Sequence, residues 1–265
     1  MAKGKEVVKA KKAAPPPAII DDMNDLMEQD AGAGLENIRP EDMAIPFIVI
    51  LQALSPQVKR GEQQIEDAKE GDIYNTVTGG VFAGSEGVIF IPVAFKKAIV
   101  EWRPREEGGG FIAQHDDREI MEGATKDEDS GKLVTENGNV LVDTAYHYGL
   151  LVDPVTGDYE NAVIAMTSTQ LKKSRKWNSL MSSIKMTKSD GVTKFTPPIF
   201  SQMYRLTTVP EENAVGSWSG WDIEHIGPVA SLDIYQAAKL FAENINKGLI
   251  KIAPPQSSPE GEDAF

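Results

Sequence analysis

Basic residues are concentrated around one tryptophan in the middle of the chain. Lys172, Lys173, Arg175 and Lys176 lie within five positions of Trp177, and no acidic residue stands among them. Ammonium and guanidinium groups bind phosphate oxygens through charge and through hydrogen bonds. The segment "QLKKSRKWNSLM" therefore indicates a surface that binds a polyanion.

This basic segment belongs to a strongly acidic protein. The chain has a formal net charge of −13 over 265 residues. Between Asn161 and Pro210, however, eight basic residues face one acid, Asp190, so this segment carries +7 and the remainder −20. Segregated charge repels itself, and a polyanionic ligand would relieve that repulsion. The alternative is a solvated basic helix face that acids elsewhere in the fold balance.

The periodicity of the segment predicts a helix with two different faces. Trp177, Leu180, Met181 and Ile184 follow helical spacing and form an apolar face that would pack on the rest of the protein. At 100° per residue, the basic residues and several serines lie on another face. Trp177 is therefore predicted to anchor the helix. Thr169 is its predicted N-cap.

Aromatic residues suggest a second component of the site. Single-stranded nucleic acid is bound by stacking bases on aromatic rings beside a basic groove. Trp218 and Trp221 lie in "GSWSGW", where small polar residues surround both rings, although burial in the core is the alternative for each ring. The predicted DNA-binding residues are Lys172, Lys173, Arg175, Lys176, Lys185, Lys188, Tyr204, Arg205, Trp218 and Trp221.

Most of the chain has the pattern of short strands separated by turns. The apolar runs "IPFIVILQ" and "GVIFIPVAFKKAIVEW" predict buried strands, with Pro92 at an edge or a bulge. Asn137-Gly138 predicts a hairpin turn. A final helix begins after Ser231 and ends at Gly248. This order predicts a mainly β (β-rich α+β) fold, namely an OB-like Greek-key barrel with an internal helix and a C-terminal helix.

Composition predicts one domain between two disordered segments. Residues 1–34 combine lysines, "PPP" and acids, and residues 253–265 are rich in Pro, Ser and acids, so neither offers much apolar surface to bury. The OB-like domain is expected to span residues 35–252. Within it, the polar, glycine-rich stretch 105–131 is expected to be a surface excursion with little regular structure.

Motifs for catalysis and metal binding are missing from the sequence. The absence of cysteine excludes disulfides and thiolate zinc sites, and none of the three histidines has a second histidine at a suitable spacing. "DEDSGK" departs from a calcium loop at Gly131. No apolar run reaches the roughly 20 residues of a membrane span. We expect a protein that is not an enzyme and has no cofactor; a metal-dependent nuclease using Asp116 and Asp117 is a minor alternative.

Together these features resemble bacteriophage single-stranded DNA-binding proteins. The resemblance rests on the OB-like strand series, the acid-poor "QLKKSRKWNSLMSSIKMTK", "GSWSGW" and a tail ending "GEDAF". It implies sequence-tolerant binding of single-stranded DNA in phage replication, recombination or repair, and the expected location is the cytoplasm of the infected host. A homo-oligomer is a further expectation. The resemblance also implies a tail that contacts replication proteins such as a polymerase or helicase. The predicted partner-binding residues are Glu260, Glu262, Asp263 and Phe265.

A protein of the virion or of its assembly is the main alternative function. A β-barrel domain suits that role as well as it suits DNA binding. The two hypotheses predict different observations. The first predicts that the chain binds DNA, and the second predicts that the chain is present in purified phage particles.

Overall fold

The structure, a computed structural model, describes residues 21–39, 42–128, 131–214, 216–250 and 252. It forms two compact units, Met1–Asp42 and Met43–Phe265. In the first unit, helix α1 (Asp21–Gln29) is followed by turns. Part of the segment expected to be disordered is therefore helical, while residues 1–20 lie outside the described part.

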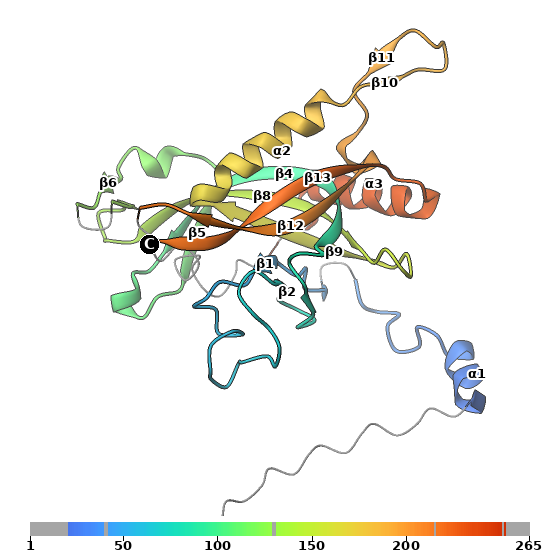
Figure 1. Cartoon of the computed structure of the whole chain (residues 1–265), viewed down its shortest axis with the longest axis horizontal. Helices are drawn as coiled ribbons and strands as arrows, with labels where there is room; N and C mark the ends of the chain where they lie inside the picture. Colours follow the sequence, from blue (N-terminus) through green and yellow to red (C-terminus); the bar gives the residue numbers. More distant parts are fainter. Residues whose placement is uncertain (1–20, 40–41, 129–130, 215, 251, 253–265) are drawn as a thin grey trace, which may run out of the picture. The chain divides into compact units, whose positions relative to one another are not determined.

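A curled antiparallel sheet forms the centre of the second unit (Figure 1). Its long strands are β4 (Val88–Trp102), β8 (Val140–Val152), β9 (Tyr159–Thr167), β12 (Gln202–Glu212) and β13 (Ser217–Pro228). β4 pairs along nearly its whole length with β8, and β8 pairs with β9. β12 pairs with the first residues of β4 and with β13 on its other side.

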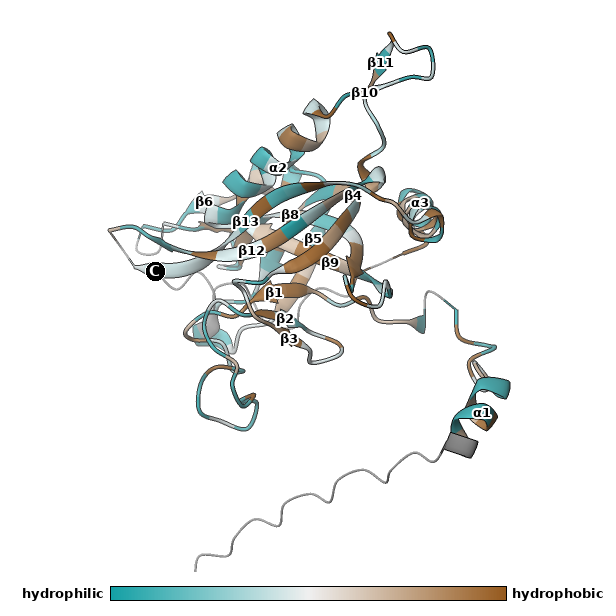
Figure 2. Ribbon diagram, turned by 45° about the vertical axis from the view of Figure 1, so that its right-hand side comes forward, coloured by the Kyte–Doolittle hydropathy of each residue, from teal (hydrophilic) through white to brown (hydrophobic). Residues whose placement is uncertain are grey.

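The central strands are apolar because both of their faces are covered. Along β4, Ile89, Ile91 and Val93 pack into one buried cluster, whereas Phe90 packs into a second cluster across the sheet. A strand buried on both faces has a continuous apolar sequence rather than an alternating one. In Figure 2 the hydrophobic colour is concentrated in these central strands.

A β-bulge in β4 helps to curl the sheet. The register passes from Pro92 opposite Gly149 to Ala94 opposite Tyr148, which leaves Val93 as the extra residue. Pro92 was predicted to lie at an edge or a bulge, and the structure shows the bulge. Such a bulge bends the strand and increases its twist. A side chain at position 149 would lie 2.4 Å from the carbonyl oxygen of Ile91, so this close approach requires glycine.

Shorter elements surround the main sheet. β1 pairs with β2, β2 with β3, and β10 only with β11, whereas β5 pairs with β4 and β6–β7 extends from β8. Residues 105–131, expected to have little regular structure, instead contain β5, β6 and two 3-10 turns, so that expectation is corrected. The short strands are β1 (Ile48–Ile50), β2 (Ile73–Asn75), β3 (Val81–Phe82), β5 (Phe111–His115), β6 (Thr125–Lys126), β7 (Leu133–Val134), β10 (Met186–Thr187) and β11 (Lys194–Phe195).

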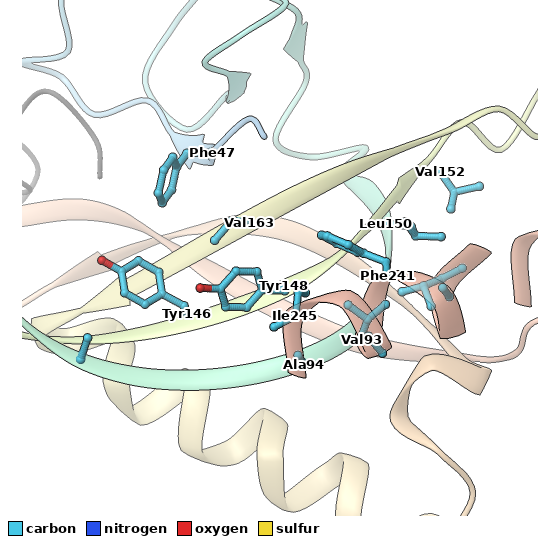
Figure 3. Close-up of a cluster of buried hydrophobic side chains, with 14 of the residues drawn as sticks. Phe47, Val93, Ala94, Tyr146, Tyr148, Leu150, Val152, Val163, Phe241 and Ile245 are labelled. Carbon is cyan, nitrogen blue, oxygen red and sulfur yellow. The ribbon is translucent and has the colours of Figure 1, made fainter. Parts of the chain in front are cut away.

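Helix α3 (Leu232–Asn246) covers one face of the sheet (Figure 3). Its buried Phe241 and Ile245 pack with residues of β4 and β8 such as Val93 and Leu150. Ser231, after which the final helix was predicted to begin, is its N-cap, because the Ser231 hydroxyl accepts a hydrogen bond of 3.3 Å from the backbone N–H of Ile234. The final helix therefore lies where the sequence placed it.

Helix α2 (Leu171–Ser183) packs on the other face. Trp177 is 1% exposed and contacts the rings of Phe90, His147 and Tyr204, which confirms its role as the anchor of the helix. The predicted N-cap Thr169 is wrong. A 3-10 turn over Ser168–Gln170 precedes the helix, and its N-cap residue is Gln170, which makes no side-chain capping bond.

The predicted fold class is confirmed. The second unit is mainly β, α2 lies between β9 and β12 in the chain, and α3 follows β13. The sheet forms a curled half-barrel, and within the described residues its strands β9 and β13 are not paired with each other. Of the helices described, none has both the length and the apolar character needed to cross a membrane.

Candidate functional site

The solvent-facing side of α2 displays three cations. Lys172, Arg175 and Lys176 are exposed, and in the described part of the chain no carboxylate lies within 4.0 Å of their charged groups. Arg175 Nε donates to the carbonyl oxygen of Leu171 at 3.2 Å. This cationic face of α2, defined by Lys172, Arg175 and Lys176, has the charge that a polyanion requires.

The exposed serine hydroxyls of α2 are directed to their own helix. Ser179, Ser182 and Ser183 donate to backbone carbonyls three or four positions earlier, at 2.8–3.0 Å. Each hydroxyl carries one proton, so these groups do not donate to a ligand in this arrangement. Any contact of this helix with phosphate would therefore depend on the cations.

Lys173 differs from its neighbours because it is paired. Its Nζ lies 2.7 Å from Glu211 Oε1, and Glu211 also accepts hydrogen bonds from Trp218 Nε1 at 2.9 Å and from Gln170 Nε2 at 3.3 Å. Gln170 Oε1 in turn accepts from the backbone N–H of Trp221 at 3.0 Å. Glu211 therefore ties the start of α2 to the β12–β13 hairpin.

The environment of Glu211 keeps it charged. Partial burial would by itself raise the pKa of its carboxyl group, but the hydrogen bond and charge of Lys173, with the bonds from Trp218 and Gln170, bring that pKa below its ordinary value. A carboxylate held in this way accepts from several donors at once. Lys173 is thus held in an ion pair within the protein, whereas Lys172 is free to contact a ligand.

Two of the three aromatic residues expected to stack on bases are buried. Tyr204 is 0% exposed and Trp221 is 2% exposed, and both belong to the cluster that contains Trp177. A base cannot reach an enclosed ring, so the stacking role expected for Tyr204 and Trp221 is corrected to a packing role. Trp218 is only partly buried, but its indole N–H is bound to Glu211.

Arg205 is not brought together with the cationic face of α2. Successive side chains of a strand point to opposite faces, and Tyr204 faces Trp177 of α2, so the adjacent Arg205 points to the other face of the sheet. There it stands opposite Glu224 of β13. A narrow cleft separates α2 from β13, and its lining residues are Lys173, Lys176, Trp177, Leu180, Asp222 and Ile223.

Lys185 and Lys188 lie on a hairpin that continues from the end of α2 (Figure 1). We call residues 185–196 the β10–β11 arm. Lys185 Nζ donates to Thr196 Oγ1 across the arm, and Lys188 is exposed. Neither lysine forms an ion pair with any described residue. The structure thus joins five of the predicted DNA-binding cations, three on α2 and two on the arm, and none of the five is in an ion pair with a described residue.

The remaining predicted residues are not joined to this surface. Glu260, Glu262, Asp263 and Phe265 lie outside the described residues. Asp116 and Asp117 are exposed after β5. The described part of the chain contains no cluster of three or more histidine or carboxylate side chains positioned to hold a metal ion.

A buried histidine beneath α2 was not singled out from the sequence. His147 of β8 is 0% exposed, its Nε2 is hydrogen-bonded to Ser174 Oγ at 2.8 Å, and its ring stacks on Trp177 with centroids 4.4 Å apart. Burial lowers the pKa of His147 to about 3. The imidazole is therefore neutral at physiological pH, and it supports α2 through packing and one hydrogen bond.

Acid is expected to destabilise the fold through His147. The unfolded chain takes up this proton near pH 6.5 and the folded chain only near pH 3, so stability is lost as pH falls between these values. At pH 4.5 this amounts to roughly 3 kcal/mol relative to neutral pH. Urea unfolding at pH 7 and pH 4.5 measures it. The double variant His147→Phe/Ser174→Ala should lose less stability on acidification, and an equal loss would contradict the assignment.

Comparison with known proteins identifies a family. A scan against protein-family models matches residues 10–251 to the family described as Pam3 phage gp34-like protein. This match includes the whole sheet, α2, the β10–β11 arm and α3. A search of the curated proteins found no match, and a search of the solved structures found none.

Proposed function

The chain belongs to the Pam3 phage gp34-like protein family, and from this premise we propose that it binds single-stranded DNA without sequence preference. Its role would lie in phage DNA replication, recombination or repair in the cytoplasm of the infected host. The observation that carries the proposal is the unpaired cationic face of α2, which continues into the lysines of the β10–β11 arm.

Electrostatics favours a polyanion as the ligand of this surface. The cations gather in a segment of +7 within a chain of −13, and no described carboxylate forms an ion pair with the three cations of α2 or with Lys185 and Lys188 of the arm. The 13 residues of α2 extend over about 20 Å. A surface of this length contacts several successive phosphates of a strand, and each contact releases counterions.

The acidic C-terminal residues complete the proposal. Glu260, Glu262 and Asp263 precede a terminal Phe265 on a segment rich in proline and serine. We propose that this tail contacts replication proteins and competes with DNA for the cationic face, because its charge is opposite to that of α2. Deleting residues 254–265 should then raise DNA affinity, most strongly at low salt where attraction between charges is least screened.

Binding to oligo-dT is expected to weaken steeply with salt. Five phosphate contacts to single-stranded DNA give a slope of about −3.5 in log K against log salt, so affinity should fall roughly 10²-fold between 50 and 200 mM. Fluorescence anisotropy of a labelled oligonucleotide measures this slope. Absence of binding at low salt, both by the full chain and by the chain without residues 254–265, would disprove the proposal. Stoichiometric recovery in purified phage particles, without DNA binding, would support a virion or assembly protein instead.

A further inference from the structure

The β10–β11 arm is a hairpin with little support from the rest of the protein. Among the described strands, β10 and β11 pair only with each other, through Met186 opposite Phe195 and Thr187 opposite Lys194. Two-stranded hairpins are at best marginally stable in water when they stand alone. The hairpin leaves the C-terminal end of α2 in the views of both Figure 1 and Figure 2.

The turn of the arm is nevertheless well defined. Asp190 Oδ1 accepts hydrogen bonds from the backbone N–H groups of Val192 and Thr193, at 2.9 and 2.8 Å. These bonds, with one from the Thr193 side chain, lower the pKa of the Asp190 carboxyl group. Gly191 has a φ of +75°, which glycine adopts without strain. The only acid of the arm is therefore used to build its turn.

Pairing across the arm places an aromatic ring beside a cation. Directly opposed residues share a face, and the backbone N–H of Lys188 donates to the carbonyl of Thr193, so Lys188 lies on the face of Met186 and Phe195. Lys185 and Lys194 lie on the other face. Met186 contacts Gln202 Nε2 through its sulfur at 4.0 Å, but Met186 remains 40% exposed and Phe195 36% exposed. Phe195 makes no ring contact with any described aromatic residue.

We propose that the β10–β11 arm is the base-stacking element of the DNA site, with Phe195 as the ring on which a base stacks and Lys188 as a neighbouring phosphate contact. This inference rests on the proposed function and assigns it the aromatic component that Tyr204 and Trp221 cannot supply. An exposed aromatic ring between cations is the arrangement by which single-stranded nucleic acid is held without sequence preference.

The charge of the arm favours a nucleic acid over a second copy of the chain. Three lysines lie on its two faces, and its one acid is used in the turn. The arm also follows directly after the cationic face of α2 in the chain, so a strand that contacts Lys176 has a continuous path to Lys185. Stacking on Phe195 then orders the bases, while the lysines neutralise the backbone.

The test compares Phe195→Ala with Phe82→Ala, since Phe82 has the same exposed fraction of 36% but lies on β3. Each variant is titrated with oligo-dT and with an abasic oligomer of equal length and charge. Phe195→Ala should bind oligo-dT about 10-fold more weakly, with an unchanged salt slope, and should bind the abasic oligomer like the wild type. Phe195→Tyr should retain affinity for oligo-dT, whereas Phe195→Leu should not.

Three results would overturn the inference. Equal affinity of Phe195→Ala and the wild type for oligo-dT would show that no base stacks on this ring. An equal loss on both oligomers would show that Phe195 acts through the shape of the arm. A difference in molar mass between Phe195→Ala and the wild type, measured by light scattering, would show that the arm joins two copies of the chain. In each case salt-dependent binding by the wild type would leave the proposed function standing, whereas no binding by the wild type would remove both.

Discussion

The triple variant Lys172→Ala/Arg175→Ala/Lys176→Ala is expected to bind oligo-dT on the order of 10²-fold more weakly than the wild type at 50 mM salt. The reason is the loss of three phosphate contacts and of the counterions that they release. The slope of log K against log salt should become shallower by about 2, because each contact to a single strand contributes about 0.7. None of the three residues is buried or in an ion pair with a described residue, so the fold should remain intact.

A matched control separates local contacts from net charge. Lys59, Arg60 and Lys69 are also two lysines and one arginine, they are exposed, and they lie in the loop between β1 and β2. This loop lies away from α2 in the views of both Figure 1 and Figure 2. The control triple variant changes net charge equally and should leave affinity and slope nearly unchanged. Equal weakening by both triple variants would contradict a site on α2.

Local sequence patterns predicted the secondary structure well at positions where the residue type determines the backbone conformation. The apolar spacing from Trp177 to Ile184 identified the buried face of α2, because helical periodicity depends only on neighbouring turns. Ser231 and Pro92 likewise marked a helix start and a bulge. Thr169 failed as an N-cap because a 3-10 turn, which the pattern does not distinguish from helix, occupies that position.

The burial of Trp221 could not be predicted from its neighbours. Small residues around the ring suggested exposure, but Gly220 is small for a different reason. A side chain there would lie 2.5 Å from Glu211 Oε2 and 2.8 Å from Gln170 Nε2, so the glycine makes room for the bonds that join α2 to the hairpin. Glu211, the acid of that network, follows the acid-poor segment 161–210 by one residue. Only folding of the chain brings its carboxylate to Lys173.

Strand β5 was missed because its side chains are mostly exposed. Its pairing with β4 uses backbone hydrogen bonds, and its short sequence FIAQH shows no alternation of apolar and polar residues. Phe195 was missed for a related reason, since two-residue strands are too short to show alternation. Its signal was an aromatic residue one position from Lys194 in the acid-poor segment. Position in the fold, rather than residue type alone, decided which aromatic rings are accessible.

Trp177→Ala is expected to destabilise the fold by about 3–5 kcal/mol, as large aromatic truncations in a core do. The ring is enclosed between β4, β8 and β12, where it contacts Phe90, His147 and Tyr204. Its indole N–H has no hydrogen-bond partner in the described structure, so Trp177→Phe should cost much less while keeping ring contacts. Urea unfolding at neutral pH measures both variants.

The same pair of variants tests whether Trp177 acts by anchoring α2 or by touching DNA. If it anchors the helix, Trp177→Phe should bind oligo-dT like the wild type, because the cationic face stays in place. Trp177→Ala should bind oligo-dT more weakly because α2 is less firmly held on the sheet. A loss of amide protection along α2 in hydrogen exchange of this variant would show that the helix has loosened. Weak binding by Trp177→Phe with unchanged stability and protection would instead place a base against the indole. The 1% exposure of the ring makes that second outcome the unexpected one, because a base could reach it only after α2 had moved away from the sheet.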